Sequence, residues 1–139
     1  MSSKQQKRLF IIDGYATLYR AHYALIRNPL TNTAGTPTSA VFGFANQVFQ
    51  LIDDEKPDYL VAAFDSKGKN FRHELFTDYK ANRSAMPDEI QTQLPYLWEL
   101  LDAMNIPILR VGGVEADDII GTVAKMCDKE NLQCNIVSG

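Results

Sequence analysis

The sequence predicts an α/β fold in which a mostly parallel sheet is flanked by helices. Short, nearly continuous apolar runs alternate with stretches of helical periodicity, which is typical of parallel strands joined by helical crossovers. The length of 139 residues, with 45% hydrophobic amino acids, is enough for one hydrophobic core. Because no repeat or low-complexity tract divides the chain, we interpret residues 1–139 as a single domain.

Four apolar runs predict the strands, at residues 9–13, 59–65, 106–111 and 134–139. Four stretches predict the helices, at residues 16–27, 38–54, 88–104 and 115–129. Pro95 is expected to kink or divide the third helix. The second helix is expected to bury one face formed by Val41, Phe44, Ala45, Val48, Phe49 and Ile52. The fourth is expected to turn Ile119, Ile120, Val123 and Met126 inward.

Composition excludes several classes of protein. No apolar run approaches the roughly 20 residues that span a bilayer. Cys127 and Cys134 fit neither a C-x-x-C motif nor a disulfide framework, and indicate reduced thiols in a cytosolic protein. The net charge of −3 does not draw the chain to nucleic acids or anionic membranes. Any polyanion must therefore be bound by a local basic patch.

Five acidic side chains follow three predicted strands. Asp13 and Asp65 each end an apolar run, and Glu115, Asp117 and Asp118 open the helix after the third run. In a parallel sheet these positions fall at one edge, where ligands of open α/β sheets gather. Carboxylate oxygens without His or Cys suit a hard cation such as Mg²⁺ or Mn²⁺. The alternative is that these acids only form turns and cap helices.

The segment 66–87 is a long polar insertion after the second strand. It holds five of the chain's 14 Lys and Arg residues, with aromatic side chains between them: Lys67, Lys69, Arg72, Lys80 and Arg83, with Phe71, Phe76 and Tyr79. Cations that neutralise phosphates beside rings that stack on bases favour single-stranded nucleic acid. A solvated loop anchored by Phe71 and Phe76 is the alternative. A weaker phosphate-binding candidate is the loop with Thr36 and Thr38 before the second helix.

Four motifs resemble, in order and spacing, the 5′–3′ exonuclease domain of bacterial DNA polymerase I, a flap-endonuclease family. They lie at residues 10–25, 35–44, 63–83 and 113–121 and cover nearly the whole chain. The resemblance implies a PIN-like, resolvase-like fold with residues 66–87 forming a helical arch. It implies a two-metal nuclease with Mg²⁺ or Mn²⁺ held by Asp13, Asp65, Glu115, Asp117 and Asp118.

The resemblance also implies roles for basic and polar side chains. Arg20, Arg72, Lys80 and Arg83 match the family's catalytic basic residues, and a wider DNA-binding set comprises Lys67, Lys69, Arg72, Tyr79, Lys80, Arg83, Thr36 and Thr38. The implied substrate is DNA with a 5′ flap, a nick or a single-stranded 5′ end, cleaved in primer removal and nick translation. A monomer in the bacterial cytoplasm, associated with the nucleoid and using no small-molecule cofactor, is expected.

The chain departs from the family pattern at its last residue. In the family, the strand ending in Val-Ser-Gly runs into an Asp-x-Asp pair, and a helix–hairpin–helix segment follows later; neither is present after Gly139. We therefore expect the N-terminal portion of a domain, with weak or no activity of its own. Two alternatives stay open: a non-catalytic DNA-binding module, and a phosphatase-like or receiver-like α/β domain.

Overall fold

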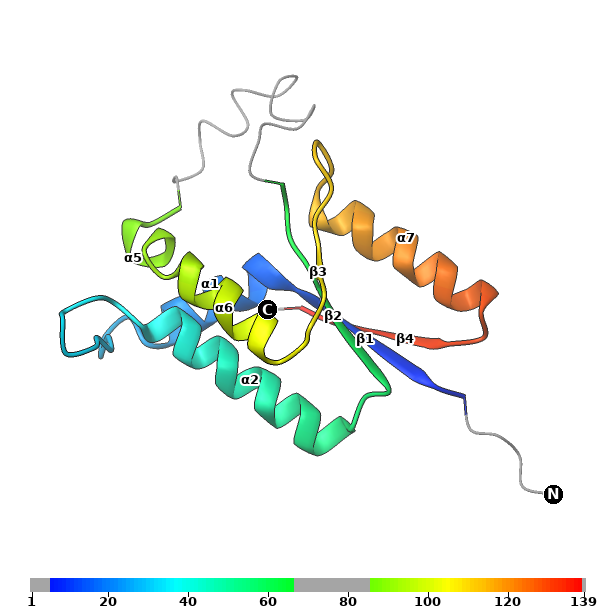
Figure 1. The fold of residues 1–139 in the computed structure, drawn as a ribbon, viewed down its shortest axis with the longest axis horizontal. Coiled ribbons are helices and arrows are strands. Elements are labelled where there is room, and N and C mark those ends of the chain that lie inside the picture. Colours follow the sequence, from blue (N-terminus) through cyan, green and yellow to red (C-terminus); the bar gives the residue numbers. More distant parts are fainter. Residues whose placement is uncertain (1–5, 67–85, 139) are drawn as a thin grey trace.

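The computed structural model describes residues 6–66 and 86–138 (Figure 1). The predicted insertion therefore lies largely outside the described residues. In chain order the elements are β1 (Arg8–Asp13), α1 (Gly14–Ala24), α2 (Ser39–Glu55), β2 (Tyr59–Ala63), α5 (Asp88–Gln91), α6 (Leu94–Ala103), β3 (Ile108–Leu109), α7 (Ala116–Lys129) and β4 (Gln133–Val137). Among the described helices, none is long and apolar enough to cross a membrane.

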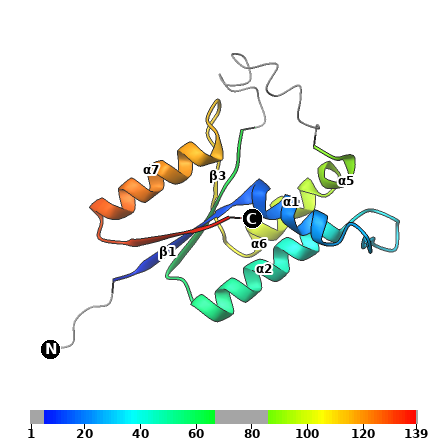
Figure 2. The same ribbon diagram turned by 180° about the vertical axis from the view of Figure 1, so that it is seen from behind.

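The four strands form one parallel sheet in the order β3-β2-β1-β4, which confirms the predicted fold class. Helix α7 covers one face, and α1, α2 and α6 cover the other (Figures 1 and 2). The alternation of side chains in β1 separates the two cores, because Ile11 packs with α7 while Ile12 packs with the opposite helices. Such double coverage explains why the central strands are continuously apolar.

Several element boundaries differ from the sequence prediction. Helix α1 ends at Ala24 rather than near residue 27. The predicted helix 88–104 is divided into α5 and α6, as expected, but the break falls at Thr92 and Gln93; Pro95 lies in the first turn of α6, where its missing N–H leaves no helical hydrogen bond unmade. Strand β3 is only two residues long, because Pro107 has no N–H to donate and the chain turns between Val111 and Val114.

Helices α2 and α7 bury fewer side chains than the sequence predicts. Phe49 and Ile52 of α2 are 52% and 37% exposed, and Met126 of α7 is 59% exposed. In α7 the buried position is Cys127, which continues the stripe begun by Ala116, Ile119 and Ile120. Adjacent helix positions differ by about 100°, so a helix lying on a sheet buries a narrower stripe than periodicity alone suggests.

Gln93 links α2 to the chain segment between α5 and α6. Its side chain is fully buried, accepting from the Val41 N–H at 3.0 Å and donating to the Glu89 carbonyl at 2.7 Å. Gln93→Ala leaves both groups unpaired, and we expect it to lower the free energy of unfolding by about 2–3 kcal/mol in urea denaturation. The exposed neighbour Gln91 is the control, because Gln91→Ala should cost about 0.5 kcal/mol or less. Equal losses in both variants would contradict this role.

Candidate functional site

Asp13 sits where the first strand becomes the first helix. It is the last residue of β1 and the N-cap of α1, and its Oδ1 accepts from the Ala16 N–H at 3.5 Å. The next residue, Gly14, is buried against the ring of Phe64, which leaves no room for a Cβ atom. The turn is therefore tight, and it holds the Asp13 carboxylate at the carboxyl edge of the sheet.

Asp65 lies two residues beyond β2, on the strand next to β1. Asp13 pairs with Ala63 in the register, so Asp65 projects from the same edge. Its Oδ1 accepts from the N–H of Ala116, the first residue of α7, at 2.7 Å. This carboxylate thus caps α7 from a distant part of the chain and fixes the start of that helix against β2.

The three remaining acids surround the start of α7. Glu115 occupies the N-cap position and is half-buried, and Asp117 and Asp118 are exposed in the first turn. Negative side chains at this end of a helix are favoured by its macrodipole. Several of these acids therefore do cap helices, as the alternative prediction had it. Asp13 and Asp65 accept hydrogen bonds from N–H groups at helix starts, and Asp117 and Asp118 lie in the first turn of α7.

The charges of two other acids, Asp117 and Asp65, act on the carboxyl group of Asp13. Burial raises the pKa of the Asp13 carboxyl, the hydrogen bond from Ala16 lowers it, and the charges of Asp117 and Asp65 raise it further. A cation placed beside these carboxylates would offset the repulsion that the charges of Asp117 and Asp65 exert on Asp13. The donor set, which consists of carboxylate oxygens alone, suits a hard divalent ion.

The metal-binding geometry itself remains a prediction. Among the residues that the structure describes, no group of three or more His, Cys, Asp or Glu side chains lies close enough to hold a metal ion. The structure brings Asp13, Asp65 and Asp117 within electrostatic range at one edge, and it does not arrange them as a coordination shell.

The other predicted site residues are placed only in part. Arg20 is exposed on α1. In the loop before α2, the Thr36 N–H donates to Asn32 Oδ1 at 2.9 Å, and Thr38 is the N-cap without a side-chain capping bond. The basic and aromatic members of the DNA-binding set lie outside the described residues: Lys67, Lys69, Arg72, Tyr79, Lys80 and Arg83. Their roles stay predictions.

Sequence reasoning missed a cation at this edge. The Arg110 guanidinium lies over the Trp98 ring, with Cζ 4.9 Å from the ring centroid, and near the Tyr15 side chain. Burial raises the pKa of Tyr15, while the charge of Arg110 lowers it and that of Asp65 raises it. The available signal was that Arg110 is the single charged residue in the apolar run 106–111.

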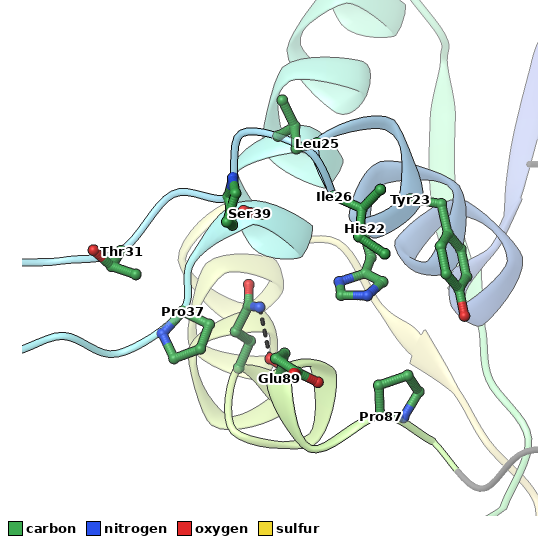
Figure 3. A pocket seen from close by; sticks show the side chains of 11 residues that line it. His22, Tyr23, Leu25, Ile26, Thr31, Pro37, Ser39, Pro87 and Glu89 are labelled. Atoms are coloured by element: carbon green, nitrogen blue, oxygen red, sulfur yellow. Dashed lines mark hydrogen bonds between the residues drawn. The ribbon is translucent and has the colours of Figure 1, made fainter.

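A separate hollow of about 460 Å³ lies between the end of α1, the loop that follows it and α5 (Figure 3). His22, buried on α1, lines it together with Pro37, Pro87 and Glu89. None of the five candidate acids lines this hollow. We therefore place the candidate site at the carboxyl edge of the sheet rather than in the hollow.

Replacing Asp13 by asparagine should stabilise the metal-free protein. The pKa of Asp13 is higher in the folded protein than in the unfolded chain. The free energy of unfolding therefore falls as the pH rises from the usual carboxyl pKa to the raised one. At neutral pH the ionised Asp13 carboxylate destabilises the fold. Asparagine removes this charge and can still cap α1. With chelator present, thermal scans should show a higher midpoint for Asp13→Asn at pH 7, and the difference should disappear near pH 3.

The exposed acid Asp102 on α6 provides the control for that comparison. Asp102→Asn should leave the midpoint nearly unchanged at both pH values. A lower midpoint for Asp13→Asn than for the unsubstituted chain at pH 7 would show that the carboxylate stabilises the fold.

The sheet order, the two helical layers and the acidic edge together define a resolvase-like, PIN-like α/β domain. Solved structures share this fold. The bacteriophage T5 5′-exonuclease with bound zinc has a TM-score of 0.62 and 19% identity, covering 95% of this chain and 49% of that one. A bacteriophage T5 flap endonuclease in a complex with DNA and metal ions has a TM-score of 0.60, also at 19% identity, and covers 95% of this chain and 48% of that one.

The family assignment rests on sequence. The family described as "5′-3′ exonuclease, N-terminal resolvase-like domain" matches residues 8–139, and the chain belongs to it. DNA polymerase I of Caldicellulosiruptor bescii is 43% identical over 132 residues, which is 95% of this chain and 15% of that protein. The 5′-3′ exonuclease of Aquifex aeolicus is 39% identical over 95% of this chain and 45% of that protein. The chain thus spans less than half of either relative.

Proposed function

We propose that this chain is the metal-binding N-terminal part of a structure-specific 5′ nuclease. In this proposal it acts within a DNA polymerase I and hydrolyses phosphodiester bonds at nicks, 5′ flaps and single-stranded 5′ ends during primer removal and repair. The observation that carries the proposal is the placement of Asp13, Asp65 and Asp117, from three chain segments, within electrostatic range at one sheet edge. Relatives named DNA polymerase I and 5′-3′ exonuclease support it.

The proposed cofactor is Mg²⁺ or Mn²⁺, with two ions in the complete site. Asp13, Asp65, Glu115, Asp117 and Asp118 would hold them, and the metal ions in the T5 structures are consistent with this assignment. Bound divalent ions acidify water and stabilise negative charge on a phosphate. The chain's own contribution is to hold carboxylates in place: Asp65 fixes the start of α7, and the turn at Gly14 fixes Asp13.

The proposed partner is DNA, bound by a monomer in the bacterial cytoplasm without any small-molecule cofactor. Because the net charge is −3, binding has to come from local cations. Arg20, Arg72, Lys80 and Arg83 would contact phosphates near the reacting bond, and Lys67, Lys69, Tyr79, Thr36 and Thr38 would guide the strand. The T5 flap endonuclease complex with DNA supports this proposal.

Cleavage of a labelled 5′-flap DNA tests the proposal. The 139-residue chain should cleave weakly or not at all in Mg²⁺ or Mn²⁺. The same chain extended by the remainder of the Aquifex aeolicus 5′-3′ exonuclease, of which it spans 45%, should cleave the flap in Mg²⁺. Asp65→Ala in the extended polypeptide is the control and should remove the activity. An extended polypeptide that is folded and inactive would contradict the proposal.

A non-catalytic DNA-binding module is the second candidate. It is favoured by one observation, namely that no group of three potential ligands is close enough to hold a metal among the described residues. It predicts salt-dependent binding of single-stranded 5′ ends without cleavage, by the extended polypeptide as well as by the chain alone. Metal-dependent cleavage by the extended polypeptide would exclude it.

A further inference from the structure

Arg110 is held in place from two sides at the carboxyl edge of the sheet. Ala63 pairs with Leu109, and the Phe64 N–H donates to the Leu109 carbonyl, so Arg110 follows directly at the end of β3, level with Phe64. Its guanidinium lies over the Trp98 ring, with Cζ 4.9 Å from the ring centroid, and close enough to the Tyr15 hydroxyl for its charge to lower the pKa of that group. Phe64 contacts both rings edge-on, with centroids 5.0 Å from Tyr15 and 4.9 Å from Trp98, so the rings that hold Arg110 are themselves packed in the core.

The charge of Arg110 is available to a ligand. The residue is exposed, and the one ion pair found among the described residues joins Arg8 to Glu55. Neither Trp98 nor the Tyr15 hydroxyl carries a negative charge, so its present partners orient the guanidinium without neutralising it. A cation held this way loses less conformational freedom on binding an anion than a lysine on a free stem does.

We propose that Arg110 binds a backbone phosphate of the DNA strand at the acidic edge. The inference rests on the proposed function, and it adds Arg110 to the DNA-binding residues that the family resemblance implies. A guanidinium has its N–H groups in one plane, which matches two oxygens of a phosphate, and the contact with the Trp98 ring restricts how that plane is oriented. In this proposal Trp98 and Tyr15 act as positioning residues, because they lie against Arg110. The arginine places one positive charge at the sheet edge where the Asp65 carboxylate also lies, so it can stabilise a phosphate of a DNA strand that approaches the carboxylates.

DNA binding by the 139-residue chain tests the inference without cleavage. A labelled single-stranded oligonucleotide with a 5′-phosphate is titrated in chelator at several salt concentrations, and anisotropy gives the dissociation constant. Arg110→Met should weaken binding about tenfold and reduce the slope of log K against log salt by about 0.7. Arg110→Lys should retain the slope and recover only part of the affinity, because it keeps the charge and loses the planar fork.

Lys125→Met is the matched control. Lys125 is exposed on α7, about 12 Å along the helix axis from Asp117, and its replacement removes the same charge. It should leave affinity and salt slope nearly unchanged. Trp98 is the only tryptophan, so its fluorescence should change on binding in the unsubstituted chain and less so in Arg110→Met. Thermal unfolding confirms that each variant is folded.

Two results would overturn the inference. One is a folded Arg110→Met variant that binds with unchanged affinity and salt slope, and the other is no DNA binding by the unsubstituted chain. If flap cleavage by the extended polypeptide persists in either case, the proposed function stands and the role of Arg110 alone is refuted. Loss of binding in Lys125→Met equal to that in Arg110→Met would also refute a specific role for Arg110.

Discussion

Asp65→Asn is expected to abolish metal-dependent flap cleavage while the domain stays folded. The asparagine Oδ1 can still accept from the Ala116 N–H, so the start of α7 keeps its cap. The negative charge that a divalent ion needs is lost, and we expect at least about a 100-fold fall in the cleavage rate of the extended polypeptide. Mn²⁺ affinity, measured by calorimetry on the 139-residue chain, should fall in parallel.

Two further variants separate charge from structure in that experiment. Asp65→Ala removes the cap as well as the charge, so it should also lower the free energy of unfolding by about 1 kcal/mol. Asp128→Asn removes an exposed acid near the far end of α7 and should change neither activity nor stability. An Asp65→Asn variant that cleaves at the unsubstituted rate would show that this carboxylate caps a helix and does nothing more.

Gly14→Ala is expected to be the most destabilising small substitution in the described part of the chain. A Cβ atom at this position would lie closer than 3.0 Å to three carbon atoms of the Phe64 ring. Phe64 is fully buried and packed edge-on against Tyr15 and Trp98, so the ring cannot move aside without disturbing the core. Overpacking of this kind should lower the free energy of unfolding by about 3 kcal/mol.

Gly121→Ala is the opposite case and serves as the control. Gly121 lies inside α7, it is exposed, and no atom lies within 4 Å of the position its Cβ would take. Alanine should therefore stabilise the helix by about 0.5–1 kcal/mol. Urea denaturation of the two variants should shift in opposite directions. A Gly14→Ala variant as stable as the unsubstituted chain would mean that the strand–helix turn can widen.

Much of the fold could be predicted from the sequence because strands and helices leave local patterns in it. Continuous apolar runs located the strands, and helical periodicity located all the long helices, since both patterns depend on which residues face a core. Its errors have a common cause. Periodicity shows which side of a helix is apolar, but it does not show how wide a strip of that side the neighbouring elements cover. For this reason Phe49, Ile52 and Met126 were predicted to be in the core, whereas they are exposed. Strand length at the sheet edge depended on Pro107 and the turn after Val111.

The candidate site, like the fold, has features that the sequence predicts and features that only the structure shows. The sequence by itself determined that Asp13, Asp65 and the acids of α7 follow three different strands, and motif resemblance determined the family. Only the tertiary structure decided that Asp65 caps α7, that the charges of Asp65 and Asp117 act on Asp13, and that Arg110 lies over Trp98 and near Tyr15. The physical reason is distance along the chain. Strand ends follow local pattern, whereas all of these interactions except that of Arg110 with Trp98 join segments about 50 or more residues apart, and the packing of Phe64 and the sheet register set them.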